Sequence, residues 1–114
     1  MKNPYAKGAN FERKLMKYHN ELGFDTFRMA GSHSFADLIM FYEDFTYFVQ
    51  CKNREFNNTD FNESIDKMRP FIEKYKLRSS HPFFKFWIVF KGRNKDKTGK
   101  FFEVYEVDSD KIYA

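Results

Sequence analysis

The strongest constraint on the fold is a pair of apolar runs, residues 38–41 and 45–52, with a short connection between them. Both runs are typical of β-strands, and a connection this short predicts an antiparallel hairpin. In such a hairpin Asp37, at the start of one strand, lies alongside Gln50 and Lys52, at the end of the other. The pairing therefore gathers three polar side chains at one end of an otherwise apolar unit.

These polar residues have the chemistry of a metal-dependent site that cleaves phosphodiester bonds. Side chains two apart share a face of a strand, so Gln50 and Lys52 project together while Cys51 projects to the opposite side. Mg²⁺ takes oxygen ligands, and Asp37 offers a carboxylate, Gln50 an amide oxygen and Cys51 its backbone carbonyl. Lys52 would orient or help deprotonate the attacking water, or stabilise charge on the phosphate. We expect Mg²⁺ as the cofactor, with Mn²⁺ as a substitute.

A first helix is predicted over residues 9–22, and a strand over residues 24–30 follows it. Gly23 provides the C-terminal stop of the helix. Glu12 borders the apolar side of the helix and is, on helix pattern alone, either a site residue or an ordinary exposed glutamate paired with a lysine. Four residues at helical spacing form the predicted buried stripe: Phe11, Leu15, Tyr18 and Leu22.

A second helix is predicted from about Asp60, because Asp60 and Glu63 have the spacing of a capping box. Pro70 is expected to kink this helix or to split it in two. Residues 53–59 form a predicted loop that either contacts DNA, moves, or is simply solvated. The chain ends in a predicted hairpin of residues 83–91 and 100–107, whose basic connecting loop is either a phosphate contact or a solvated tip.

Taken in order, these segments resemble the PD-(D/E)xK nuclease superfamily, and within it the archaeal-type Holliday junction resolvases. The resemblance covers nearly the whole chain. Residues 8–15 resemble the family's first helix with its glutamate, and residues 28–32, Arg-Met-Ala-Gly-Ser, follow in the expected place. Ala36-Asp37 stands where the family has Pro-Asp, and Gln50-Cys51-Lys52 stands where it usually has Glu-x-Lys.

The resemblance implies an α/β fold with a restriction-endonuclease-like core, in which helices flank a mixed β-sheet of about five strands. The length of 114 residues predicts a single domain, which under this resemblance is a nuclease domain over residues 1–114. The resemblance also implies that Glu12 joins Asp37 and Gln50 around the metal, that Lys52 serves the water, and that Ser32 acts on a loop near the scissile phosphate. Ala36 removes only a backbone restraint. Gln50 removes a negative charge and should weaken metal binding, although some superfamily members with Gln-x-Lys remain nucleases.

The charge balance favours an anionic partner. The formal net charge is +4 and the isoelectric point is about 9.1, with basic residues gathered in the opening segment that contains the predicted first helix. A basic setting attracts phosphates and releases their counterions, whereas the alternative is a solvated helix face. His33, between two serines, is either a phosphate contact or an ordinary surface histidine. The full set of expected DNA contacts is Lys7, Arg13, Lys14, Arg28 and His33.

Cys51 is the only cysteine, so an intrachain disulfide is excluded and a reducing, cytoplasmic compartment is expected. No apolar stretch approaches the roughly 20 residues that a bilayer span needs, and the N-terminal segment lacks a signal-peptide core. We therefore expect a soluble, intracellular, DNA-associated protein without a membrane partner, a description that also fits a viral or phage origin.

The sequence thus predicts a Mg²⁺-dependent, structure-selective endonuclease that makes paired nicks near the branch point of four-way DNA junctions. Aromatic residues make up 21% of the chain, more than a small core hides easily, which favours a symmetric homodimer with two related sites. Two alternatives stay open. One is a restriction-type or other DNA endonuclease of the same fold, and the other is a catalytically silent DNA-binding module in which Gln50 marks a degraded metal site.

Overall fold

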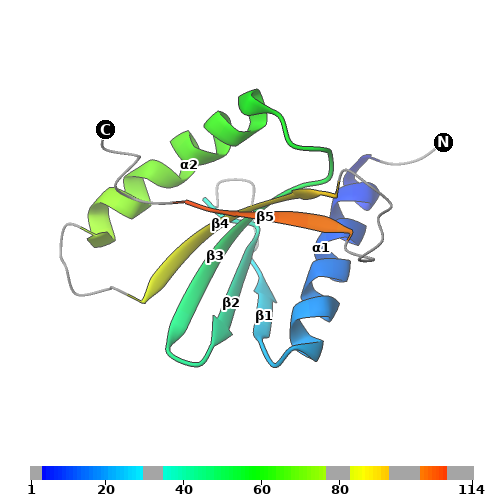
Figure 1. Ribbon diagram of the computed structural model, residues 1–114, viewed down its shortest axis with the longest axis horizontal. Coiled ribbons are helices and arrows are strands. Elements are labelled where there is room, and N and C mark those ends of the chain that lie inside the picture. The colour runs from blue at the N-terminus through cyan, green and yellow to red at the C-terminus, as the bar shows by residue number, and fades with distance from the viewer. Residues whose placement is uncertain (1–3, 30–34, 77–82, 93–100, 108–114) are drawn as a thin grey trace.

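A computed structural model describes residues 4–29, 35–76, 83–92 and 101–107 of the 114-residue chain. Two helices and five strands follow one another in the order αβββαββ (Figure 1). Their bounds are α1 Pro4–Glu21, β1 Asp25–Arg28, β2 Leu38–Tyr42, β3 Phe45–Lys52, α2 Asn58–Lys76, β4 Phe84–Lys91 and β5 Phe102–Glu106. No helix among these described segments is long and apolar enough to cross a membrane.

The strands form one mixed sheet in the order β1-β2-β3-β4-β5. Only β3 and β4 run parallel, and α2 makes the crossover between them; the other neighbours are antiparallel. The β2–β3 hairpin has the predicted register, with Leu38 opposite Val49. The sequence-based prediction of an α/β fold with a mixed sheet of about five strands is therefore confirmed.

A helix packs on each face of the sheet. On the α1 side, the core cluster contains Phe11, Leu15, Leu38, Met40, Val49, Val89 and Phe102. On the α2 side, it contains Phe35, Ala36, Met68, Ile72, Phe86, Ile88 and Phe90. Because neighbouring residues of a strand face opposite ways, Val49 and Cys51 belong to the α1 side, and Gln50 and Lys52 to the other.

The end of α1 corrects one prediction. Leu22 was expected in the buried stripe, but it lies in the turn after the helix and is 54% exposed. The helix ends at Glu21, Gly23 has a φ of 101°, and the Phe24 amide closes the end by donating to the His19 carbonyl at 2.9 Å. His19, which is 3% exposed, therefore takes the buried helical position that the sequence pattern gave to Leu22.

The start of α2 differs from its prediction as well. The capping residue is Asn57, whose Oδ1 accepts from the Asp60 amide at 2.8 Å while its Nδ2 donates to Asp60 Oδ2 at 2.8 Å. The reciprocal pair is thus Asn57 with Asp60, rather than Asp60 with Glu63. Arg54 also pairs with Asp60 at 3.3 Å, and its carbonyl accepts from the Lys91 amide at 2.9 Å. The segment leaving β3 is therefore tied to both α2 and β4.

Pro70 does not split α2, which is one helix from Asn58 to Lys76. A proline removes one intrahelical hydrogen bond and was therefore expected to interrupt the helix. Met68 and Ile72, on either side of it, are both completely buried in the core. Their packing holds the helical path across the proline, since tertiary burial supplies most of a helix's stability in a folded protein.

One half of the sheet has no helix over its second face in the described part of the chain. Thr26 and Arg28 contact α1, so Phe27 lies on the opposite face. Ile39 and Phe41 lie there too, because Leu38 and Met40 belong to the α1-side core. Helix α2 packs on β4 instead. Phe27 and Phe41 are 54% and 41% exposed, and their rings meet edge to face at 6.0 Å.

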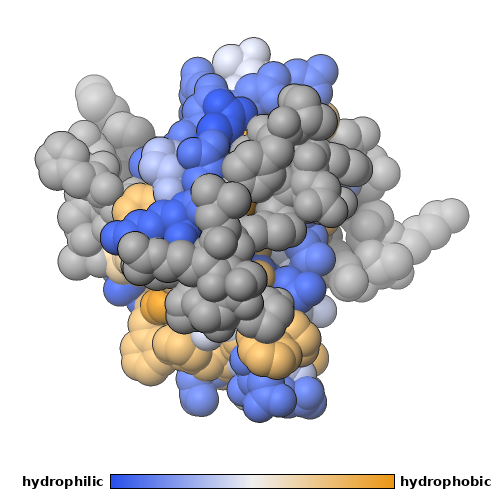
Figure 2. All heavy atoms as spheres, turned by 90° about the vertical axis from the view of Figure 1, so that its left-hand side faces the viewer, coloured by the Kyte–Doolittle hydropathy of each residue, from blue (hydrophilic) through white to orange (hydrophobic). Residues whose placement is uncertain are grey.

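Hydrophobic surface is not spread evenly over the protein. Figure 2 shows hydrophilic residues in the upper part of one side of the molecule and hydrophobic residues gathered lower down. The exposed large apolar side chains of the described residues are Leu22, Phe27, Phe41, Phe83 and Val104. Three of these five side chains belong to strands of the sheet: Phe27, Phe41 and Val104.

Candidate active site

Asp37 is fixed at the point where the chain enters β2. Its amide donates to the Val49 carbonyl at 2.8 Å, and its own carbonyl accepts from the Met29 amide at 2.9 Å. Its side chain is held as well, since Oδ2 accepts a hydrogen bond from the Cys51 amide at 2.8 Å. The backbone of two neighbouring segments therefore positions this carboxylate at the end of the sheet.

Glu12 reaches the same place from α1. Its side chain is 16% exposed, and Arg28 Nε donates to its Oε1 at 3.0 Å. Burial raises the pKa of Glu12, and the negative charge of Asp37 raises it further, while Arg28 offsets part of this. The two carboxylates therefore lie close enough to repel each other. The structure thus places Glu12 near Asp37, while their shared role at a metal stays a prediction.

Cys51 lies beside these carboxylates but is not reactive. Burial raises the pKa of its thiol well above the ordinary value, and the charges of Asp37 and Glu12 add to this effect. A thiol that stays neutral is a poor nucleophile, so Cys51 acts through its backbone and its packing. Its amide anchors Asp37, and its side chain packs against the α1-side core.

Gln50 is buried on the other face of β3, with 2% of its surface exposed. Its Nε2 donates to the Phe35 carbonyl at 2.7 Å, just before the chain reaches Asp37. The side-chain nitrogen thus braces the segment that leads into the site. This contact also fixes the orientation of the amide, because the nitrogen must face the carbonyl.

Lys52 ends β3 and is half-buried. Its backbone is part of the β3–β4 ladder, and its ammonium group forms no hydrogen bond or ion pair with any other residue that the structure describes. Arg13 and Lys14 are exposed on α1, and Arg13 Nη1 donates to Asn10 Oδ1 at 3.2 Å. Ser32 and His33 lie outside the described residues, and so does the side chain of Lys7. The basic loop between β4 and β5 lies outside them too.

The donor set fits a hard divalent cation. Across the described segments, no group of three or more His, Cys, Asp or Glu side chains lies close enough together to hold a metal. Two carboxylates, Glu12 and Asp37, lie near enough for the charge of one to act on the other, and Gln50 carries an amide on the neighbouring end of β3. All three supply oxygen atoms, which Mg²⁺ and Mn²⁺ accept. A cation between the carboxylates would relieve the repulsion that raises the pKa of Glu12.

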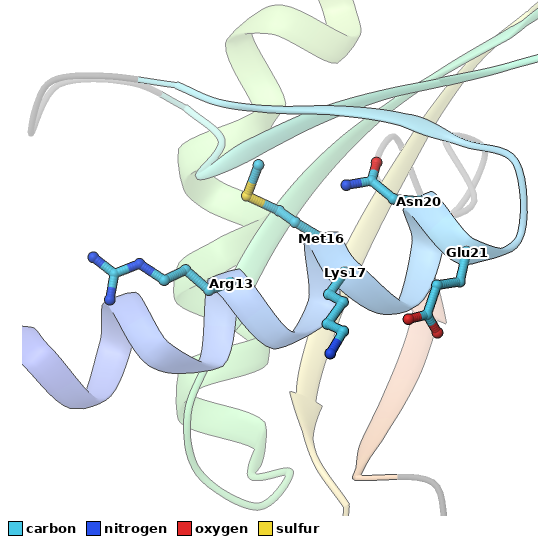
Figure 3. A pocket seen from close by; sticks show the side chains of 5 residues that line it. All are labelled: Arg13, Met16, Lys17, Asn20 and Glu21. Carbon is cyan, nitrogen blue, oxygen red and sulfur yellow. The ribbon is translucent and has the colours of Figure 1, made fainter.

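A shallow hollow of about 420 Å³ lies along α1, away from the carboxylate pair. Figure 3 shows the side chains of the described residues that line it, each of which comes from this helix: Arg13, Met16, Lys17, Asn20 and Glu21. Arg13 and Lys17 give it positive charge, and Arg13 stands next to Glu12 in the chain. The hollow therefore extends the basic surface of α1 and does not contain the predicted catalytic residues.

The sequence pattern did not reveal the partner of Glu12. Arg28 was predicted to contact DNA, and the structure places its guanidinium on Glu12, 16 residues away in the chain. A signal for this contact exists in the alternation of β1, where Thr26 and Arg28 share one face and Thr26 Oγ1 bonds Asn20 of α1 at 2.9 Å. The DNA contact of Arg28 remains a prediction.

A helix glutamate, a strand-entering aspartate and a Gln-x-Lys strand end on a mixed five-stranded sheet are the pattern of the PD-(D/E)xK class of nucleases. A family model described as archaeal Holliday junction resolvase (hjc) matches residues 3–110, and the chain therefore belongs to this family of nucleases. No significant match was found among curated protein sequences.

A solved structure supports the fold independently. It is that of Archaeoglobus fulgidus Hjc, a Holliday junction resolvase from an archaeal hyperthermophile. The two share 16% sequence identity with a TM-score of 0.57, over 84% of this chain and 72% of that chain. At this level of identity the likeness shows a shared fold.

Proposed function

We propose that the protein is a divalent-metal-dependent DNA endonuclease that resolves four-way junctions by paired nicks near the branch point. The proposal depends on the proximity of the Glu12 and Asp37 carboxylates. Asp37 precedes β2 at the edge of the sheet where β3 ends with Gln50 and Lys52. In a member of the Holliday junction resolvase family, this arrangement is most simply a phosphodiesterase site.

Each residue has a distinct task in this proposal. Glu12, Asp37, the Gln50 amide oxygen and the Cys51 carbonyl would hold Mg²⁺, with Mn²⁺ as a substitute. When bound, the ion would polarise the phosphoryl group and lower the pKa of a water molecule. Lys52 orients that water or stabilises the charge that builds on the phosphate. The Cys51 amide keeps the Asp37 carboxylate in place before substrate arrives, because it already holds Oδ2 at 2.8 Å.

The basic surface of α1 supports a nucleic-acid substrate. Arg13 and Lys14 are exposed on the same helix that delivers Glu12 to the site. Phosphate contacts of this kind position a duplex without reading its bases, so they suit recognition of DNA by shape. They also predict binding that falls steeply with salt. Ser32 and His33 would add contacts near the scissile phosphate.

A symmetric homodimer completes the proposal, because two strands of a junction must be cut. The exposed face of Phe27, Ile39 and Phe41, here called the β1–β2 patch, is the apolar surface that favours this partner. A two-fold axis through the patch would bury the same residues of both copies and would relate two active sites. Apolar burial is the general driving force for such association.

The test is a cleavage assay on labelled four-way junctions, linear duplexes and single strands, with and without Mg²⁺. The proposal predicts metal-dependent cutting of the junction. Cutting of duplexes as efficiently as junctions would identify another DNA endonuclease of the same fold. Binding of the junction without any cutting, at every Mg²⁺ or Mn²⁺ concentration, would identify a silent DNA-binding module.

A further inference from the structure

The Arg28 guanidinium is already paired with Glu12, one of the carboxylates of the proposed metal site. Arg28 Nε lies 3.0 Å from Glu12 Oε1. Arg28 is the last residue of β1 and is paired with Leu38, the neighbour of Asp37. The next amide along the chain, that of Met29, donates to the Asp37 carbonyl at 2.9 Å. The guanidinium is therefore the counterion of Glu12, and it extends from the end of a strand whose next residue is hydrogen-bonded to the backbone of Asp37.

The two partners of this ion pair differ in exposure. The Glu12 side chain is 16% exposed, whereas the Arg28 side chain is 52% exposed. Glu12 is confined by its helix and by the sheet, but Arg28 borders solvent and its guanidinium is free to swing outward. Only the arginine can leave the contact without unpacking the protein.

A divalent cation and the Arg28 guanidinium would compete for the same oxygen atoms of Glu12. A cation bound between Glu12 and Asp37 repels the guanidinium and takes over its electrostatic role. The displaced guanidinium is planar and can donate two parallel N–H hydrogen bonds to the oxygen atoms of a phosphate group. It would be released beside the site, where the DNA backbone has to lie.

We propose that Arg28 is an exchangeable counterion, which holds Glu12 when metal is absent and moves to a DNA phosphate when metal binds. The inference rests on the proposed function and adds a regulatory device to the same site. It makes metal binding and DNA binding cooperative, because each favours the arrangement in which Arg28 has left Glu12. It also prevents the two carboxylates from remaining unbalanced in the metal-free protein.

The first test measures Mn²⁺ binding to the DNA-free protein by electron paramagnetic resonance. Arg28→Met should bind Mn²⁺ about tenfold more tightly than wild type, since the lost competitor is one charge-assisted hydrogen bond. Arg13→Met is the matched control. It removes a guanidinium that also lowers the pKa of Glu12 by its charge but bonds Asn10 instead, so its affinity should change much less.

The outcomes separate this inference from the function beneath it. One outcome would overturn the exchange but leave the metal site intact. In that outcome wild type binds Mn²⁺, Asp37→Asn does not, and Arg28→Met binds Mn²⁺ no more tightly than wild type. Absence of Mn²⁺ binding in both wild type and Arg28→Met would overturn the metal site itself. Thermal unfolding of each variant shows whether it is folded, and Arg28→Lys, which keeps the charge, should give an affinity between those of wild type and Arg28→Met.

The second test follows the released guanidinium on the DNA. Junction binding is measured against salt concentration, once in Ca²⁺ as a non-cleaving probe and once in EDTA. In Ca²⁺, wild type should have a steeper salt dependence than Arg28→Met by about one phosphate contact, or a slope difference of about 0.9. In EDTA the two proteins should agree. The same slope difference in both conditions would mean that Arg28 binds DNA independently of metal, which contradicts the exchange.

Discussion

The side-chain amide of Gln50 donates a 2.7 Å hydrogen bond to the backbone carbonyl of Phe35, inside the protein. This contact gives the Gln-x-Lys variant of the motif a structural meaning. An ionised glutamate has no hydrogen to donate, and its oxygen would face another oxygen in a buried place. Gln50 therefore supports the path of the chain into Asp37 while leaving its own amide oxygen as the proposed ligand.

The first prediction follows from this contact. Gln50→Glu should lose about 1–3 kcal/mol of stability in EDTA, because the Phe35 carbonyl loses its donor and a buried charge is left unpaired. Mn²⁺ should restore more stability to this variant than to wild type, and the metal concentration for half-maximal cleavage should fall. Thermal unfolding with increasing Mn²⁺, together with cleavage titrations, provides the measurement.

Gln50→Met is the matched control for this prediction. It removes the same donor without adding a charge, so it should lose stability in EDTA but gain no extra stability from Mn²⁺. An unchanged metal requirement in Gln50→Glu would place residue 50 outside the coordination sphere.

The second prediction concerns the catalytic step. Asp37→Asn and Lys52→Ala should each reduce junction cleavage at least about a hundredfold while leaving junction binding in EDTA nearly intact. The asparagine side-chain oxygen can still accept from the Cys51 amide, so the first variant should keep its fold. Gel-shift binding and single-turnover cleavage separate the two effects. Binding that is lost in parallel with cleavage would show that these residues are structural.

The third prediction concerns the β1–β2 patch. Phe41→Glu should convert a dimer into a monomer, because it places a charge in the centre of the proposed interface. Leu22→Glu is the control, since Leu22 is likewise an exposed apolar residue, at 54% against 41% for Phe41, but lies outside the patch, in the turn after α1. Sedimentation velocity measures both. If Phe41→Glu and wild type had the same oligomeric state, the patch would not be the interface.

The fourth prediction concerns stability at acidic pH. His19 is 3% exposed, its Nδ1 lies 2.8 Å from the Leu15 carbonyl, and aromatic rings of Tyr18, Phe24 and Phe102 surround it. Burial lowers its pKa from the ordinary value of 6.5. The unfolded chain therefore binds a proton more readily than the folded protein, and stability should fall as the pH decreases from about 6.5 towards the lowered pKa.

The control for this prediction is His19→Gln, which removes the titrating group. Its stability, measured by chemical denaturation, should depend less on pH below about 6.5 than that of wild type. Glu12 acts in the opposite direction because its pKa is raised, so only the difference between the two proteins isolates His19. An identical pH dependence in both proteins would contradict the role given to His19.

The local sequence pattern predicted the parts of the fold that depend on neighbouring residues. The alternation of Val49, Gln50, Cys51 and Lys52 placed each side chain on its correct face, and the short hairpin connection determined the pairing with β2. Where tertiary packing decides, the pattern was insufficient. Leu22 continues the helical stripe in sequence, but the chain turns at Gly23, and Pro70 stays helical because the residues around it are buried.

In the candidate site, too, local pattern and family resemblance predicted some features, while contacts between distant segments were not predicted. Asp37 was expected at the site from the strand pattern and Glu12 from the family resemblance, and the charge of Asp37 is near enough to raise the pKa of Glu12. Their role as metal ligands stays a prediction. The Arg28–Glu12 pair and the Gln50–Phe35 hydrogen bond were not foreseen. Both join segments that are far apart in the chain, and one of them ends on a backbone carbonyl, which carries no sequence signature.

The most direct test of the central claim is a comparison of two end-labelled substrates of the same sequence, a four-way junction and a linear duplex, in Mg²⁺. Nick positions are mapped on every strand at single-nucleotide resolution. We predict paired, nearly symmetric nicks on opposing strands close to the branch point, with the duplex uncut and all nicks absent in Asp37→Asn. Binding and cutting of the duplex as well as the junction would contradict the assignment as a junction-resolving nuclease.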